Sequence, residues 1–290
     1  MEQMRSSEEI KRLIIDVGKK DDRVRAILLN GSRANKKISS DKYQDFDIVY
    51  VVNDIESFIS DKNWTNTFGD KLIWQLPDQM AIGKKGPERG STFSLLMLFT
   101  DGNRIDLTLL PKNDVEPTYK ADSLTIVWLD KDNIFSTIGF SNDSDYLVKE
   151  PAEKEFLDTC NEFWWVSTYV AKGLVRNEII YSKEMLETVV RPMFMTLIAW
   201  QIGIETNFSV SVGKGGKFIN RFVPPGLYKQ ILQTYSDQAL ENNWKALFQM
   251  TALFGQLAQT VAKSLGFKYE ESEEKNVKNY LQQLFEEHLK

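Results

Sequence analysis

The chain has 290 residues, of which 42% are hydrophobic and 12% aromatic, and its formal net charge at pH 7 is -5. This composition can fill one large or two medium cores and excludes an intrinsically disordered chain. Proteins that bind nucleic acid normally present a basic stripe. No block of lysine and arginine interleaved with aromatic residues occurs, so we expect no nucleic-acid partner. An acidic surface instead suits a cationic small-molecule substrate, because it concentrates opposite charge.

The counts of cysteine and histidine restrict both the compartment and the chemistry. A single cysteine, Cys160, cannot form an intramolecular disulfide, which agrees with a reducing compartment. No apolar stretch has the length of a membrane span. We therefore expect a cytoplasmic protein with no membrane partner. The only histidine, His288, excludes a multi-histidine zinc site.

The pattern of apolar residues predicts helices at both ends of the chain and strands between them. Ser6 to Glu9 hold a capping-box pattern, and the apolar residues after them recur at helical spacing, which predicts a first helix ending near Asp21. From Val24 to Asp132 short aliphatic runs alternate with turns, and from Pro151 long helices are predicted. This change of pattern marks a domain boundary. We expect one domain over 1–135, a connection over 136–149 and a helical domain over 150–290.

Two carboxylates, Asp45 and Asp47, adjoin an aliphatic run over 48–52 that predicts a strand. Residues i and i+2 share one face of a strand with a rise of about 3.3 Å per residue, so the two carboxylates should stand roughly 6 to 7 Å apart. Such a pair repels and raises each other's pKa unless a cation lies between them. Hard oxygen ligands at this spacing suit Mg²⁺.

A third carboxylate, Asp106, belongs to a predicted hairpin. Phe93–Phe99 predicts one strand, a tight turn follows, and Arg104–Leu110 predicts the returning strand, in which Asp106 faces away from its apolar neighbours. Any one of these acids alone fits a residue that caps backbone donors at a turn. Three acids within apolar strands favour a metal site, because a carboxylate there is costly without a cation. The segment from Asp78 to Gly90, with three glycines and a proline, predicts a mobile loop over or beside this site.

These residues resemble a known superfamily. Gly31-Ser32, a loop of twelve residues, Asp45-Phe46-Asp47-Ile48 and Ile105-Asp106-Leu107 are similar to the three signature elements of the polymerase-β-type nucleotidyltransferases. More closely, the chain resembles the aminoglycoside 6-adenylyltransferases, which are streptomycin-modifying resistance enzymes, over nearly its whole length. The segments that carry this resemblance include LNGSRANKKISSDKYQDFDIVYVV, DGNRIDLTLLP and SVGKGGKFINRF.

The resemblance implies an α+β fold, in which a nucleotidyltransferase domain with a mixed sheet precedes a C-terminal helical bundle. It implies transfer of AMP from ATP to a hydroxyl of an aminoglycoside, the 6-hydroxyl of streptomycin, with release of pyrophosphate. The alternatives are the same chemistry on another small or protein acceptor, and a catalytically silent nucleotide-binding module.

Roles for individual residues follow from the resemblance. Two Mg²⁺ ions are expected on Asp45 and Asp47, with Asp106 closing the site and acting as general base. The phosphates of the co-substrate ATP are expected at a turn whose glycine lets the backbone approach closely. Its members are Gly31, Ser32 and Arg33.

A long helix is predicted from about Ala152 to Asn177. At 100° per residue one of its faces should enter the core of the helical domain, and the opposite face carries two aromatic and two basic side chains. The core face comprises Phe163, Val166, Val170 and Leu174, and the opposite face Trp165, Tyr169, Lys172 and Arg176.

Two interpretations of that second face are open. In one it packs against another helix and the basic side chains extend to solvent. In the other it lines a cleft between the domains: Lys172 and Arg176 neutralise the triphosphate, and Trp165 and Tyr169 contact the nucleoside or the acceptor. By resemblance, the related kanamycin nucleotidyltransferase also uses a lysine on the first helix of its helical domain to contact nucleotide phosphate, which supports the role of Lys172.

Acidic residues precede this face on the same side of the helix. They form either a solvated flank or an acidic wall for the guanidinium and amine groups of an aminoglycoside, because charge-assisted hydrogen bonds to carboxylates are strong. These residues are Glu155, Asp158 and Glu162.

Overall fold

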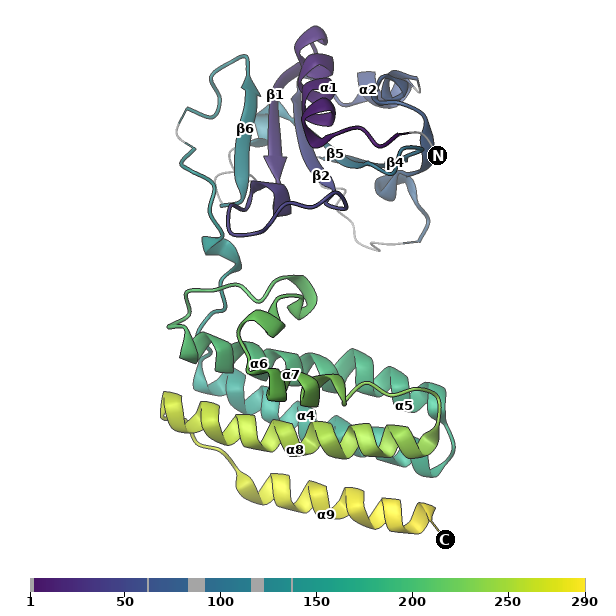
Figure 1. Cartoon of the computed structure of the whole chain (residues 1–290), viewed down its shortest axis with the longest axis vertical. Coiled ribbons are helices and arrows are strands. Elements are labelled where there is room, and N and C mark those ends of the chain that lie inside the picture. The colour runs from purple at the N-terminus through teal and green to yellow at the C-terminus, as the bar shows by residue number, and fades with distance from the viewer. Residues whose placement is uncertain (1–2, 62, 83–91, 116–122, 137, 290) are drawn as a thin grey trace. The chain divides into compact units, whose positions relative to one another are not determined.

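The computed structural model describes residues 3–61, 63–82, 92–115, 123–136 and 138–289. The chain divides into two compact units, Met1–Asp145 and Tyr146–Lys290 (Figure 1). The connection expected over 136–149 lies across this division. Its first part belongs to the first unit, because Ser141 Oγ donates to the carbonyl of Ala34 at 2.9 Å and Lys37 Nζ lies 2.7 Å from Asp143 Oδ1.

The first unit is built on a six-stranded sheet with the spatial order β3-β4-β5-β2-β1-β6. Strands β2 and β5 are parallel, and every other neighbouring pair is antiparallel, so the sheet is mixed. The predicted α+β class with a mixed sheet is confirmed. The strands are β1 (Val24–Asn30), β2 (Phe46–Val52), β3 (Lys71–Gln75), β4 (Phe93–Phe99), β5 (Arg104–Pro111) and β6 (Thr125–Asp130).

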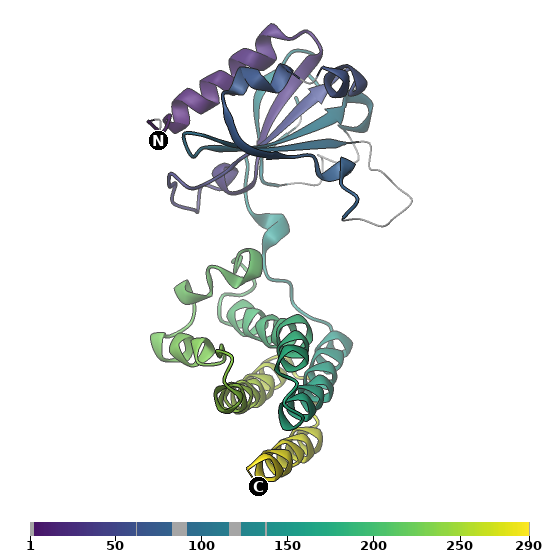
Figure 2. The ribbon, with the colours of Figure 1, turned by 90° about the vertical axis from the view of Figure 1, so that its right-hand side faces the viewer.

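Helix α1 (Ser7–Lys20) covers one face of this sheet (Figure 2). Its capping box is formed as predicted: Ser6 accepts from the Glu9 backbone, and the Glu9 side chain accepts from that of Ser6. The hydroxyl of Tyr50 donates to the carbonyl of Ile14 at 2.6 Å, which joins the helix to β2. Among the described residues, the other short helical segments are α2 (Glu56–Ser60) and 3-10 turns at Gly31–Ala34, Trp64–Phe68, Pro77–Gln79, Lys112–Asp114 and Ser144–Tyr146, the last of which extends into the second unit.

Strand alternation divides the core of the first unit between the two faces of the sheet. Ile48 and Tyr50 of β2 join the larger cluster under α1, whereas Val49 and Val51 join a smaller cluster on the opposite face. Because alternate residues of a strand share a face, Asp47 belongs with Val49 and Val51 on the less covered face. Polar side chains at the end of that face therefore need not enter the main core.

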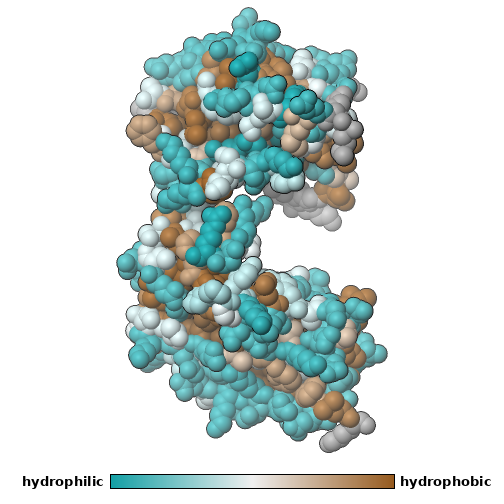
Figure 3. All heavy atoms as spheres, in the orientation of Figure 1, coloured by the Kyte–Doolittle hydropathy of each residue, from teal (hydrophilic) through white to brown (hydrophobic). Residues whose placement is uncertain are grey.

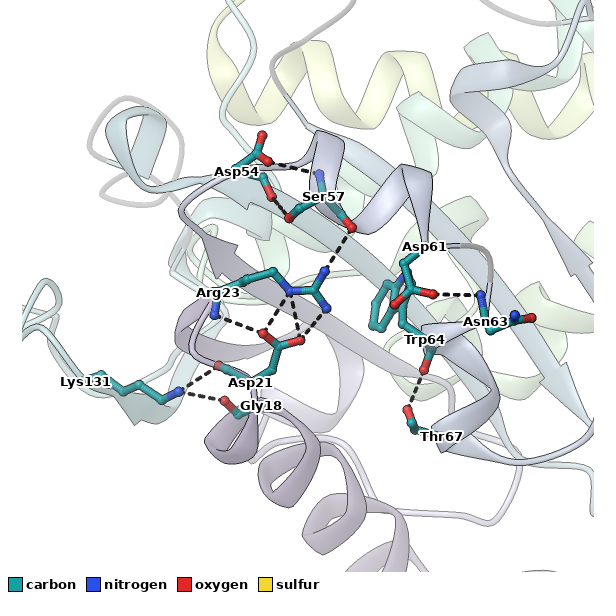
Figure 4. Close-up of polar contacts among 10 residues, drawn as sticks. All are labelled: Gly18, Asp21, Arg23, Asp54, Ser57, Asp61, Asn63, Trp64, Thr67 and Lys131. Carbon is teal, nitrogen blue, oxygen red and sulfur yellow. Dashed lines mark hydrogen bonds and ion pairs between the residues drawn. The ribbon is translucent and has the colours of Figure 1, made fainter.

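The other end of the sheet is closed by a polar network (Figure 4). The guanidinium of Arg23 donates to both carboxylate oxygens of Asp21 and to the carbonyl of Ser57, and it lies 4.0 Å from the ring of Phe58. Lys131 donates to the carbonyls at the end of α1. These contacts join helices and strands at the end of the sheet opposite Asp47, so they stabilise the unit without involving the acidic side chains.

The second unit is helical, as predicted for the C-terminal region. Helix α4 contacts α5, α6, α8 and α9 (Figure 1). Pro192 lies in the first turn of α6 directly after a π-helical turn, Leu186–Val190. The helices are α4 (Glu153–Val175), α5 (Ile179–Met185), α6 (Arg191–Glu205), α7 (Pro225–Leu232), α8 (Leu240–Leu265) and α9 (Glu271–His288).

The predicted core face of α4 is confirmed. All four of its apolar side chains are buried, and the ring of Phe163 stacks on Phe254 of α8 with centroids 3.5 Å apart. The opposite face differs, since Trp165 is 60% exposed. One helix therefore carries both a packed face and an open aromatic face.

Two sequence expectations concern segments outside these cores. Most of the predicted loop over Asp78–Gly90 lies outside the described residues, which include only its beginning.

Hydrophilic residues cover much of the surface that faces the viewer in Figure 3. No helix within the described part of the chain combines the length and apolar character that crossing a bilayer requires.

Substitutions on the two faces of α4 should lower the free energy of unfolding by unequal amounts. Phe163→Ala should lower the free energy of unfolding by about 3 to 5 kcal/mol, because it leaves a cavity against Phe254. Trp165→Ala removes a larger ring from an exposed position and should change it by less than about 1 kcal/mol. Urea unfolding followed by circular dichroism measures both. Equal losses would contradict the assignment of the faces.

Candidate active site

The candidate site begins with two acids on neighbouring strands. In the parallel pairing of β2 and β5, Asp47 lies opposite Asp106, and both side chains are half-buried. Asp45 directly precedes β2 and carries a half-buried carboxylate on the same face. Neighbouring strands lie about 4.8 Å apart, so the pairing holds the first two carboxylates side by side. The structure thus brings together the three acids predicted from the sequence.

The Gly-Ser turn lies against one of these acids. Antiparallel pairing of β1 with β2 sets Asn30 opposite Asp47, and Gly31 follows directly with a φ of +70°. A Cβ at Gly31 would collide with Oδ2 of Asp47. Glycine is required here for two reasons, the left-handed backbone and the missing side chain. The turn is a short 3-10 helix, Gly31–Ala34, whose first residue lies against Asp47.

Arg33 contacts the loop that precedes β2. Its Nε donates to the carbonyl of Asp45 at 3.0 Å, its Nη2 donates to the carbonyl of Gln44 at 2.7 Å, and the guanidinium lies 3.9 Å from the ring of Phe46. Burial lowers the pKa of Arg33 from its ordinary value. Arg33 therefore shapes the loop that carries Asp45 to the site, and its phosphate contact stays a prediction. Ser32 accepts a weak hydrogen bond from Gln44 at 3.4 Å.

Arg104 is a site residue that the sequence interpretation did not include. Its Nε and Nη2 donate to the two carboxylate oxygens of Asp106 at 2.7 and 2.8 Å. Its Nη1 lies 3.6 Å from Oδ2 of Asp45. A signal for this residue was present, because Arg104 precedes Asp106 by two positions and alternate strand residues share a face.

Burial and mutual repulsion determine the charge of the acids. Burial, followed by the negative charges of Asp106 and Asp45, raises the pKa of Asp47 to about 6. Burial also raises the pKa of Asp45, and Arg104 acts against this rise. The hydrogen bonds to Asp106 raise the pKa of Arg104, which therefore stays charged. The site concentrates negative charge, which the guanidinium of Arg104 and, to a smaller extent, that of Arg33 partly offset.

The donor set fits a hard divalent cation. All three candidate ligands supply carboxylate oxygens, and Mg²⁺ usually takes one or two protein carboxylates together with water and substrate phosphate. The guanidinium of Arg104 is a cation already bound by two of them. However, no three His, Cys, Asp or Glu side chains of the described residues are arranged as a group that could hold a metal ion.

The predicted residues of the helical region lie in the second unit. The indole nitrogen of Trp165 donates to the hydroxyl of Tyr169 at 2.7 Å, and Lys172 Nζ lies 5.7 Å from the centre of the Tyr169 ring. Arg176 is exposed and caps the C-terminus of α4. Trp165, Tyr169 and Lys172 are thus in contact one after another along the helix. Their contacts to nucleotide or acceptor stay predictions.

The three acidic residues of α4 that the sequence predicts to contact the acceptor are all exposed: Glu155, Asp158 and Glu162. Asp158 is paired, since Lys154 Nζ lies 2.6 Å from one of its oxygens. This exposed pair is easily exchanged for contacts with another cation, because surface ion pairs contribute little free energy.

A mixed sheet that sets paired carboxylates beside a glycine-serine turn is the arrangement of a nucleotidyltransferase, and comparison with known proteins assigns the chain to that class of enzyme. The family model of streptomycin adenylyltransferase matches residues 4–284. The chain belongs to this family.

Individual relatives agree with the family. The chain is 40% identical over 272 residues to an aminoglycoside 6-adenylyltransferase of Bacillus subtilis (strain 168), covering 93% of this chain and 95% of that protein. It is 39% identical over 278 residues to that of Campylobacter jejuni, covering 96% and 95%. A crystal structure of an aminoglycoside 6-adenyltransferase from Bacillus subtilis aligns with 97% of this chain and 99% of that chain, at 36% identity and a TM-score of 0.48.

The raised pKa of Asp47 gives the metal-free protein a specific pH dependence. An unfolded chain ionises Asp47 near pH 4, whereas the folded chain holds the proton to about pH 6. Its ionisation therefore removes stability as pH rises through this window, and no penalty remains below it. Relative to wild type, the free energy of unfolding of Asp47→Asn should therefore rise by up to about 2 to 3 kcal/mol between pH 4 and pH 7.5.

Urea unfolding in EDTA at the two pH values measures this gain. Asp16→Asn, at an exposed position of α1, is the control for loss of one carboxylate and should show no comparable gain. A wild-type-minus-Asp47→Asn difference that is the same at both pH values would refute the electrostatic account of Asp47.

Proposed function

We propose that this enzyme transfers AMP from ATP to a hydroxyl of an aminoglycoside, the 6-hydroxyl of streptomycin, and releases pyrophosphate. The observation that carries the proposal is the position of Asp47 opposite Asp106, next to the Gly31 turn, in a chain that belongs to the streptomycin adenylyltransferase family. Relatives that match over nearly the whole chain are named aminoglycoside 6-adenylyltransferases.

The reaction needs an acceptor for one proton. The acceptor hydroxyl oxygen forms a bond to the α-phosphorus of ATP as the bond from that phosphorus to the oxygen bridging to the β-phosphate breaks, and pyrophosphate leaves with the electron pair. The hydroxyl proton passes to the carboxylate of Asp106, which faces the same side of the sheet as Asp47. Asp106 is thus the general base.

Asp45, Asp47 and Asp106 would hold the divalent cations, and we propose two Mg²⁺ ions. When bound, these ions stabilise charge on the entering and leaving oxygens. The protein contributes the positions of the carboxylates: strand pairing fixes Asp47 and Asp106, and the contacts of Arg33 fix the loop at Asp45. Their repulsion in the metal-free site favours cation binding, because a cation relieves it.

The remaining contacts concern the co-substrates. Amide groups of Gly31 and Ser32 and the Ser32 hydroxyl would hold the β- and γ-phosphates, with Arg33 near them. Lys172 and Arg176 would neutralise the triphosphate, and Trp165 and Tyr169 would contact the nucleoside or the acceptor. The acidic residues of α4 would receive the cationic groups of the acceptor. They are Glu155, Asp158 and Glu162.

A panel of acceptors tests the proposal. Pyrophosphate release from ATP and Mg²⁺ should require an acceptor and be fastest with streptomycin, and mass spectrometry should find one AMP per acceptor. Asp106→Asn keeps the shape of the side chain but removes the base, so turnover should fall by about 10²- to 10⁴-fold.

The competing results are distinct. Turnover of another acceptor but not of streptomycin would replace the substrate and keep the chemistry. No acceptor-dependent pyrophosphate release with any acceptor would reject the reaction. Turnover by Asp106→Asn within a few-fold of wild type would reject its role as base.

Lys172 tests the role of the α4 surface. Lys172→Ala should weaken ATP binding or lower turnover about ten- to a hundredfold, because charge-assisted hydrogen bonds contribute roughly 1.5 to 3 kcal/mol. Thermal stability should change little. Lys245→Ala on α8, which removes an exposed lysine paired with the exposed Glu241, is the matched control. Kinetic neutrality of Lys172→Ala, or unfolding like that of Phe163→Ala, would show that this surface serves packing.

A further inference from the structure

The guanidinium of Arg104 occupies the acidic site. Both oxygens of Asp106 accept hydrogen bonds from it, at 2.7 and 2.8 Å, and its remaining nitrogen lies 3.6 Å from Asp45. Two of the three carboxylates are thus bound to a cation that belongs to the chain itself. This bidentate geometry is the strong form of the arginine–carboxylate pair.

These contacts compete with the proposed role of Asp106. Arg104 takes one lone pair on each oxygen of Asp106 and places its positive charge beside them, so a metal ion or a proton arriving at Asp106 is repelled. In agreement, the described residues contain no three-acid group arranged for a metal ion. The arrangement with Arg104 bound is therefore not the one in which all three acids serve a cation.

Arg104 also differs from its neighbour Arg33 in how firmly it is held. Arg33 is fixed by backbone carbonyls and by the ring of Phe46. The Arg104 side chain is 42% exposed, and the partners described above are the same carboxylates that a cation would use. A partly exposed ion pair contributes modestly to stability, so another cation can replace it.

We propose that Arg104 is a competing counter-ion: it neutralises Asp106 and Asp45 while the divalent ion is absent, and the ion binds fully only after Arg104 leaves Asp106. The inference rests on the proposed function, since it takes the same carboxylates as metal ligands. The released guanidinium pairs with the polyphosphate of the nucleotide, whose oxygens accept the same bidentate geometry.

This exchange couples the two ligands. A nucleotide that holds Arg104 away from Asp106 makes the site more favourable for the metal ion, and the ion favours the nucleotide by the same factor. It also frees Asp106 to accept the proton only when both ligands are present. Hydrolysis of ATP in the absence of the complete site is thereby disfavoured.

Metal affinity without nucleotide tests the exchange. Mn²⁺ serves as the probe, and electron paramagnetic resonance measures its free concentration at about 0.15 M ionic strength. Arg104→Gln should bind Mn²⁺ about five- to tenfold more tightly than wild type, because the competitor is gone. Arg104→Lys keeps the charge without the bidentate geometry and should lie between them. A second readout is the rise in melting temperature on adding Mg²⁺, which should be larger for Arg104→Gln.

Arg25→Gln controls for the loss of a positive charge. Arg25 also binds a carboxylate, that of Asp132, through two nitrogens, but it lies at the far end of β1 from Asn30. The separation along the strand is roughly 17 Å, about two Debye lengths at this ionic strength. Mn²⁺ affinity of Arg25→Gln should therefore stay within about twofold of wild type.

The outcomes separate this inference from the metal site itself. If wild type binds Mn²⁺, Asp47→Asn does not, and Arg104→Gln binds no more tightly than wild type, the exchange is wrong and the metal site remains. If wild type fails to bind, or Asp47→Asn binds as wild type does, both the site and the exchange are wrong. Should Arg104→Gln fail to fold, an unchanged affinity in Arg104→Lys overturns the exchange.

Discussion

The parallel pairing of β2 with β5 is the constraint on which the candidate site depends. Its register sets Asp47 opposite Asp106, and the antiparallel pairing of β1 with β2 brings Gly31 to the same end of the sheet. The acids are thereby held by strands, and strands position side chains more rigidly than loops do. The polar network around Arg23 stabilises the opposite end, so the stabilising contacts and the acidic end are separate (Figure 4).

This arrangement opposes stability at one point. Burial raises the pKa of Asp47, and the repulsion between acids on adjacent strands raises it further. The bond between Arg104 and Asp106 reduces the repulsion but occupies groups that the proposed chemistry needs. A site that binds a cation strongly is necessarily strained without one, and the remainder of the sheet must supply the difference in stability.

Local pattern was sufficient to predict much of the fold and the set of acids. Alternation in Arg104–Leu110 predicted the returning strand and the polar face of Asp106, and the Ser6–Glu9 pattern predicted the start of α1. Two contacts of Arg33 were not predictable, because their acceptors are backbone carbonyls and any residue can supply those. The partner of Arg104 was also not predictable. Strand geometry places several carboxylates within reach of its side chain but does not determine which of them it binds.

The contact between Gly31 and Asp47 links two positions that are distant in sequence. Because a Cβ at Gly31 would occupy the place of the Asp47 carboxylate, the two positions behave as one unit under substitution. In a library that diversifies this turn, every variant at position 31 would clash with Asp47, whichever side chain it carried. Redesign of the turn therefore has to begin at positions other than the glycine.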